Sequence, residues 1–380
     1  MIAYLSEQGS RVGKKRGRLI VRKGRDELLQ LKVFELDQLV LLGHIQLSSA
    51  AIRALLQAGI DTVFLTRSGR FLGRLSSGMT ANIELRLHQF RTLTTEDRLL
   101  DLARRYVRGK LRNSVALLRR HNRSLRNDAI SRATTAIRHC IIPLDSCKTA
   151  DEIRGHEGAG AAQYFGALSK IIRAPGFSFE KRLRRPPPDP INIILSLGYT
   201  LLTNIVHGLC EQAGLDPYLG ALHAPHYGRP SLPLDLIEEF RPVLVDAPML
   251  RAIHTRAIVP TDFERVEDAA SGAEDQLWRD LDAAVEEEAA QADAEHLVPP
   301  EEIARGAEEA LDLPPPRQVL LTQLGLKKWF MAFERRLEER ALYPPRDQRL
   351  SYRQILREQV YAFARHVRGD DTYEPFEYRR

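Results

Sequence analysis

The segment from Ile191 to Gly214, INIILSLGYTLLTNIVHGLCEQAG, constrains the fold more than any other part of this chain. If it is a helix, apolar side chains cover nearly its whole circumference, and such a helix needs other elements around it to be stable in water. We therefore expect a central core helix enclosed by further helices. The 380 residues of the chain suffice for a large core and for about two domains.

Most of the N-terminal segment favours strands. Short β-rich runs, RLIVRK, LQLKVFEL and LVLLG, are separated by glycine, aspartate and charged residues. TVFLTRSGRFLGRL predicts a hairpin that turns at Gly69, and ANIELRL predicts an alternating strand from Ile83 to Leu87. The predicted fold class is α+β, with a small β-rich domain at 1–92 and a larger all-α domain at 93–380.

Membrane and secreted classes are not indicated by this sequence. No uninterrupted apolar run reaches the roughly 20 residues that a membrane span requires. MIAYLSEQGS lacks the basic start and the apolar stretch of a signal peptide. The three cysteines, Cys140, Cys147 and Cys210, form no CxxC pair. We expect a cytoplasmic protein with no membrane attachment, whose thiols are small core residues.

Charge is distributed unevenly along the chain. The formal net charge is +6, but the window 267–312 contains sixteen acidic residues against two basic ones and carries −14, which leaves +20 for the remainder. A body this basic indicates a polyanionic partner, nucleic acid first, with a solvated basic surface as the alternative. The acidic window is interpreted as an inserted lobe, partly helical or disordered.

The segment after RTLTTEDRLL predicts a long helix with an apolar stripe and basic faces. The stripe comprises Leu102, Tyr106, Val107, Leu111, Val115 and Leu118. Few acidic residues separate the arginines and lysines of the other faces, so phosphate contact is as well supported as simple solvation. Candidates for contacts with the DNA backbone are Arg104, Arg105, Arg108, Lys110, Arg184 and Arg185. Tyr164 is a candidate for stacking on a splayed base, with core packing as the alternative.

Two segments carry acidic residues in unusual surroundings. In RGHEGAGAAQYF, Glu157 lies among small residues that permit close approach of another backbone or of a bulky ligand. In GALHAPHYGRPSLPLDLIEEFRP, His223 lies in a loop, and Asp235, Glu238 and Glu239 follow on a predicted helix. Three carboxylates this close repel one another unless a cation compensates them, and carboxylates with one imidazole suit Mg²⁺ or Mn²⁺. Each feature alone is also typical of an ordinary surface residue.

Together these segments resemble a known family. In order, RGHEGAGAAQYF, RRPPPDPINIILSLGYTLLTN and GLDPYLGALHAPHYGRPSLPLDLIEEFRP are similar to the CRISPR-associated integrase and endonuclease, the universal first Cas protein of the spacer-acquisition module. The resemblance extends to LVLLGHIQLSSAAIRALLQAGIDTVFLTRSGRFLGRL, ARRYVRGKLRN and LTQLGLKKWFMAFERRL. It covers nearly the whole chain apart from the acidic window at about 267–312, for which the family has no common counterpart.

The resemblance implies a divalent-metal site for Mg²⁺ or Mn²⁺. Its catalytic and metal-binding residues are then Glu157, His223 and Glu238, and Asp235 is a supporting acid. Many members of the family carry aspartate where this chain carries Glu238. Glu239 has no assigned contact with the metal and is expected to be solvated or to lie behind the site.

The resemblance also implies an activity and partners. The activity is integration of foreign DNA fragments as new spacers into a CRISPR array, by transesterification from a 3′-hydroxyl, in the adaptation stage of antiviral defence. The partners are double-stranded DNA, a second copy of the chain joined through the β-rich domain, and the ferredoxin-like second Cas protein. A metal-dependent DNase acting on branched DNA or repair intermediates is the alternative, followed by a DNA-binding scaffold and a transposon-borne relative.

Overall fold

The β-rich part of the molecule consists of the first strands of the chain. The computed structural model describes residues 1–78, 82–183, 188–224, 226–265 and 319–378. Its first elements are β1 (Ile2–Leu5), β2 (Arg11–Lys15), β3 (Arg18–Lys23), β4 (Asp26–Lys32), β5 (Gln38–Leu42), β6 (Gln46–Leu47), α1 (Ser49–Gln57), β7 (Asp61–Leu65) and β8 (Phe71–Leu75). One sheet has the order β1-β5-β7-β8 and the other the order β4-β3-β2-β6.

Strand β5 is a buried central strand of the first sheet. It pairs in parallel with β1 on one side and with β7 on the other, and all five of its residues are buried. A strand covered on both faces reads as a continuous apolar run, as LVLL does. The hairpin predicted at Gly69 is confirmed, because β7 pairs antiparallel with β8 and Gly69 has a φ of 86°.

The rest of the described chain is mostly helical. Its helices are α2 (Ile83–Leu93), α3 (Glu96–Leu125), α4 (Asp128–Ile141), α5 (Ala150–Ile171), α6 (Pro190–Ala213), α7 (Ser231–Ile237), α8 (Ala247–His254), α11 (Gln323–Glu338) and α12 (Tyr352–Arg368). Two short antiparallel pairs accompany them, β9 (Phe263–Arg265) with β10 (Val319–Leu321) and β11 (Arg340–Tyr343) with β12 (Gln348–Ser351). The predicted α+β class is confirmed, but strands β9 to β12 make the part after residue 92 mostly helical and not all-α. The acidic window and Arg184 and Arg185 lie outside the described residues.

The strand predicted from Ile83 to Leu87 is wrong, because these residues open helix α2. The Asn82 side chain caps the helix by accepting a hydrogen bond of 3.2 Å from the Leu85 backbone N–H. Leu85 is buried, whereas Ile83 and Leu87 are exposed. The alternation was too short to exclude a helix, and the cap and the packing of α2 against α12 decide the conformation.

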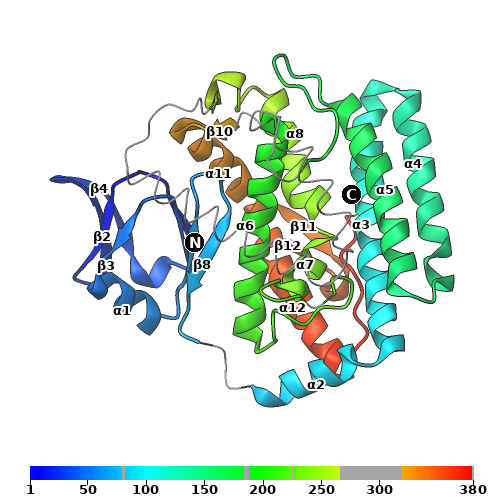
Figure 1. Ribbon diagram of the computed structural model, residues 1–380, viewed down its shortest axis with the longest axis horizontal. Helices are drawn as coiled ribbons and strands as arrows, with labels where there is room; N and C mark the ends of the chain where they lie inside the picture. The colour runs from blue at the N-terminus through cyan, green and yellow to red at the C-terminus, as the bar shows by residue number, and fades with distance from the viewer. Residues whose placement is uncertain (79–81, 184–187, 225, 266–318, 379–380) are drawn as a thin grey trace, which may run out of the picture.

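Helix α6 is the central core helix that the sequence predicted. Figure 1 shows it between the β-rich part and the group formed by α3, α4 and α5. The Asp189 side chain caps it by accepting from the backbone N–H groups of Ile191 and Asn192, and Gly214 ends it with a φ of 89°. By length and composition α6 could cross a membrane, but 78% of its most apolar window is buried in this protein, which identifies it as a core helix.

A buried polar cluster joins α6 to the β-rich part. Asp61 accepts hydrogen bonds from Gln38 Nε2 at 2.6 Å and from Arg74 Nε at 2.9 Å. Gln38 Nε2 also lies 3.3 Å from the Asn204 carbonyl oxygen of α6. Because buried polar groups are costly unless they are paired, this cluster fixes the sheet against the helix.

The last described residues pack against α3 and close the helical part. The Asn113 side chain donates to the carbonyl oxygens of Glu239 and Phe376 at 2.7 and 2.8 Å, and it accepts from the Tyr378 N–H at 2.8 Å. The Phe376 ring stacks on Phe240 with centroids 5.3 Å apart. The segment after α12 therefore supports the backbone beside Glu239.

Candidate metal and DNA site

Helices α3 and α5 bring the first predicted metal ligand into contact with a basic residue. Gly160 faces Leu111 so closely that a Cβ added to the glycine would lie 2.5 Å from Leu111 Cδ2. Beside Gly155 and Gly158, in contrast, a Cβ would meet no atom within 4 Å. The small residues of RGHEGAGAAQYF therefore serve helix packing at one position, Gly160, and Glu157 lies one turn before it.

Lys110 of α3 lies between two of the predicted metal ligands. Its ammonium forms ion pairs with Glu157 Oε1 and, at 2.6 Å, with Glu238 Oε2. The side chains of Glu157, Lys110 and Glu238 are 24%, 13% and 3% exposed, so the contact lies at the inner end of an opening to solvent. Two carboxylates that are 81 residues apart in the sequence thus converge on a single cation.

The second carboxylate is held in its ionised form. Arg241, at the start of the π-helical turn Arg241–Asp246, contacts Glu238 Oε1 at 3.1 Å. Burial by itself raises the pKa of the Glu238 carboxyl, but the charges of Arg241, Lys110 and His223 outweigh burial and hold that pKa at about 2. Glu238 is therefore an ionised oxygen donor at any physiological pH.

Asp235 orients the loop that carries His223. Its fully buried carboxylate accepts hydrogen bonds from the backbone N–H groups of Ala221, Leu222 and His223 at 2.6, 3.0 and 3.0 Å. His223 Nδ1 lies 2.6 Å from Asp235 Oδ1. Since the carboxylate is an acceptor, Nδ1 carries the hydrogen and the lone pair of a neutral ring lies on Nε2, the usual arrangement of a metal-binding histidine.

The arrangement fits a divalent cation, although it is not a closed ligand cage. Within the residues that the structure describes, no three His, Cys, Asp or Glu side chains form a ready metal-binding group. The physical reason is that Lys110 separates Glu157 from Glu238 and Asp235 takes up His223 Nδ1. Two carboxylate oxygens already directed at one cation, with an oriented imidazole nearby, are the donor types that suit Mg²⁺ or Mn²⁺.

The predicted DNA-binding residues of α3 are engaged within the protein. Arg104 donates to the Cys147 carbonyl oxygen at 2.6 Å. Arg105 pairs with Asp101 at 2.8 Å and with Glu374, and Arg108 pairs with Asp145. The Asp145 side chain is 80% exposed, so the Arg108 pair is open to solvent and exchangeable. Phosphate contact by these arginines remains a prediction.

Tyr164 is packed in the core. Its side chain is 4% exposed, and its hydroxyl donates to Asp246 Oδ2, while the Tyr199 hydroxyl donates to Asp246 Oδ1 at 2.7 Å. Burial raises the pKa of Asp246 to about 6, although the two hydroxyls and the charges of Arg182 and Arg241 oppose that shift. Stacking of Tyr164 on a base would require it to leave these contacts, so we do not propose it.

Glu239 is not the solvated residue that the sequence allowed. Its side chain is fully buried, where it accepts from Gln359 Nε2 at 2.8 Å and from the Tyr373 hydroxyl at 3.1 Å. Burial raises the pKa of this carboxyl to about 8 despite these hydrogen bonds. Glu239 therefore belongs to the core behind Glu238, and it faces away from the Lys110 contact.

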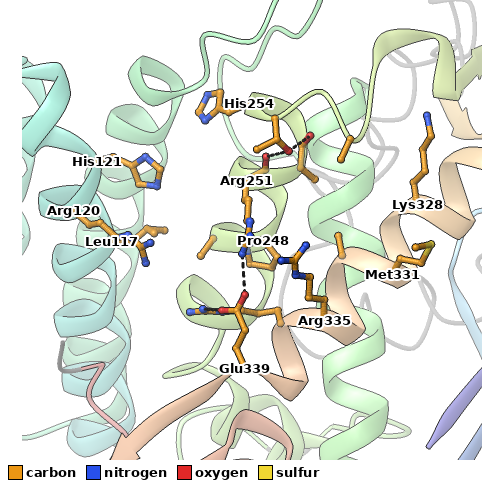
Figure 2. Close-up of a pocket in the computed structure, with 16 residues that line it drawn as sticks. Leu117, Arg120, His121, Pro248, Arg251, His254, Lys328, Met331, Arg335 and Glu339 are labelled. Atoms are coloured by element: carbon orange, nitrogen blue, oxygen red, sulfur yellow. Dashed lines mark hydrogen bonds and ion pairs between the residues drawn. The ribbon is translucent and has the colours of Figure 1, made fainter.

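A basic cavity of about 690 Å³ lies farther along α3, between α3, α8 and α11. Figure 2 shows Arg120 and His121 on one wall, Arg251 and His254 on α8, and Lys328 and Arg335 on the opposite wall. Burial is the main cause that lowers the pKa of His121 to about 4 and also lowers that of His254, so both rings are neutral. The sequence analysis missed this cavity, because its walls come from segments far apart in the chain.

Comparison with known proteins decides the family. A family model described as "CRISPR associated protein Cas1" matches residues 3–284. The chain belongs to the Cas1 family. It is 31% identical over 378 residues to a CRISPR-associated endonuclease Cas1 of Thermus thermophilus, a match that covers 99% of this chain and 95% of that protein. It is 36% identical over 282 residues to a Cas1 endonuclease of Rhodospirillum rubrum, covering 70% and 80% of the two chains.

Solved structures share the fold of this Cas1 protein. A casposase bound to its integration product superposes with a TM-score of 0.76 at 19% identity and covers 98% of this chain and 92% of that one. A Cas1 protein from Thermotoga maritima gives a TM-score of 0.73 at 21% identity and covers 99% and 100%. The family match and the similarity to the named Cas1 endonucleases confirm the expectation of a DNA endonuclease and integrase of the CRISPR system. Nucleases of this family generally depend on a divalent metal ion.

Proposed function

We propose that this Cas1 protein joins foreign DNA fragments to a CRISPR array at one metal centre formed by Glu157, His223 and Glu238. The observation that carries the proposal is the convergence of Glu157 and Glu238 on a single cation, beside an imidazole oriented by Asp235. Glu157 Oε1, Glu238 Oε2 and His223 Nε2 would hold the ion, and Asp235 would support the site without touching it. A divalent ion bound there would polarise the target phosphate and stabilise the leaving oxygen.

The remaining residues of the site prepare it for this reaction. Arg241 fixes one oxygen of Glu238, so that the other is directed toward the position of Lys110. Asp235 keeps the hydrogen of His223 on Nδ1. In the reaction the 3′-hydroxyl oxygen of the fragment forms a bond to phosphorus as the bond to the 3′-oxygen of the array breaks. The attacking hydroxyl loses a proton and the leaving 3′-oxygen gains one. Because one phosphodiester bond forms as another breaks, no external energy source is needed.

The partners follow from the same reaction. Joining to opposite strands requires two such centres at a fixed distance, which a symmetric homodimer built on the β-rich part would supply. The basic cavity beyond the site would hold the DNA backbone, because Arg120 and Arg335 present positive charge there, whereas Arg251 pairs with Glu339 at 2.9 Å. A solved Cas6-RT-Cas1–Cas2 complex covers 100% of this chain with a TM-score of 0.75, which supports assembly with the second Cas protein. A cytoplasmic location is part of this proposal.

A strand-transfer assay tests the proposal. Labelled fragment, supercoiled array DNA, Mn²⁺ or Mg²⁺ and the second Cas protein are combined with wild-type chain, Glu157→Gln, His223→Gln or Glu238→Gln. We expect joined product from the wild type alone, at least about 100-fold above each variant, and none with a chelator. Free cleavage without joined product would instead favour a nuclease of branched DNA. Full joining by Glu157→Gln would refute the metal centre.

A further inference from the structure

Lys110 is a costly residue to place at a metal centre, because its charge repels a metal ion. Its side chain is 13% exposed and makes ion pairs with both proposed carboxylate ligands. Arg241 already occupies Glu238 Oε1, which leaves Oε2 as the one oxygen that Glu238 can offer to an ion. That oxygen lies 2.6 Å from Lys110 Nζ. An ion bound to Glu238 Oε2 and an ammonium in the position of Lys110 cannot be accommodated together.

Electrostatics explain what Lys110 does when no metal is bound. Without it, only Arg241 would offset the two negative charges of Glu157 and Glu238, and neighbouring like charges destabilise a site. An ammonium on a flexible four-carbon stem neutralises them and is also able to swing away. At this site, the displaced ammonium would pair with an anionic phosphate oxygen of the DNA backbone.

We infer that Lys110 and the catalytic metal exchange at the same position, and that bound DNA drives the exchange. This inference rests on the proposed metal centre. Without DNA the ammonium occupies the place between Glu157 and Glu238, and it weakens metal binding by competition. When a DNA phosphate accepts the ammonium, the carboxylates are released for the metal. DNA and metal therefore bind cooperatively, and by linkage each tightens the other by the same factor.

Binding of Mn²⁺ to the full chain, followed by electron paramagnetic resonance or calorimetry, tests the inference without relying on activity. We expect Lys110→Met to bind Mn²⁺ roughly tenfold or more tightly than the wild type when no DNA is present, because a charge-assisted competitor is removed from both carboxylates. Lys110→Gln keeps a neutral donor, should also bind more tightly, and serves if the methionine variant does not fold. Arg112→Met removes an exposed charge of α3 that pairs with Glu377, and it should stay within about twofold of the wild type.

A short DNA duplex provides the second measurement. It should tighten Mn²⁺ binding by the wild type and by Arg112→Met, and it should do so several-fold less for either Lys110 variant. Equal or weaker Mn²⁺ binding by both Lys110 variants, or an undiminished effect of DNA on them, would overturn the exchange. Wild-type Mn²⁺ binding that Glu157→Gln leaves unchanged would refute the proposed metal centre itself, so the two failures are distinguishable.

Discussion

Replacement of Asp235 by asparagine separates the positioning of His223 from the chemistry of the metal ligands. The carboxylate accepts four hydrogen bonds, three from backbone N–H groups and one from His223 Nδ1, and it is fully buried. Asparagine keeps one acceptor oxygen but turns an NH₂ group toward buried donors that then have no partner. Each unsatisfied buried donor costs about 1–3 kcal/mol, so we expect Asp235→Asn to lower the free energy of unfolding by about 3–5 kcal/mol.

The effect on the metal is the more specific part of this prediction. Loss of the partner that fixes a histidine ligand typically lowers metal affinity by roughly 10–100-fold, and we expect a loss in this range for Mn²⁺. The two measurements are urea unfolding and Mn²⁺ calorimetry. The matched control is Asp262→Asn. Asp262 is another buried aspartate, which accepts from the Val259 N–H at 2.9 Å and from Lys328 Nζ at 2.7 Å.

The control should lose stability without losing metal affinity, because Asp262 lies near α11 and not at the Lys110 contact. An Asp235→Asn protein that is destabilised but binds Mn²⁺ as tightly as the wild type would show that the His223 loop keeps its geometry unaided. That result would refute the positioning role. A protein with unchanged stability would refute the hydrogen-bond argument as a whole.

Three further predictions concern packing, pH and DNA. Gly160→Ala should lose about 1–3 kcal/mol of unfolding free energy, because its added Cβ meets Leu111. Gly158→Ala, whose Cβ meets no atom within 4 Å, should gain about 0.5–1 kcal/mol. Thermal unfolding of both variants measures the difference. The Glu239 carboxyl has a folded pKa of about 8, above its ordinary value of 4.5, so its stabilisation is complete below that ordinary value and is lost as pH rises through 8. Urea unfolding from pH 5 to 9 should show a loss of about 4 kcal/mol in the wild type and a much smaller one in Glu239→Gln; parallel curves would contradict the assignment. Arg335→Gln in the basic cavity should reduce the salt slope of DNA binding by about one, whereas Arg349→Gln on β12 should leave it unchanged.

Periodicity predicted the secondary structure correctly where the pattern was long. The prediction was wrong where the pattern was short. Twenty-four residues of all-round apolarity identified α6, and Gly69 identified a hairpin. The alternation from Ile83 to Leu87 was compatible with both periods, and only the Asn82 cap and the contacts of α2 made it a helix. Local sequence contains no information on such distant contacts.

The candidate site shows the same limit more sharply. Spacing alone left Glu157 and His223 as ordinary surface residues, and the resemblance to a family selected them. Lys110 was predicted to contact DNA because it lies on a basic helix, but the structure pairs it with Glu157 and Glu238. That pairing depends on how α3, α5 and α7 pack together, which no segment encodes by itself.

The attachment of residues 373–378 to α3 has a consequence for the order in which the protein is made. Asn113 holds the Glu239 carbonyl oxygen together with Phe376 and Tyr378, and these last residues follow every proposed ligand in the chain. A ribosome therefore releases Glu157, His223 and Glu238 before the segment that steadies their surroundings has emerged. The backbone beside Glu239 acquires this support only after all three proposed ligands have been synthesised.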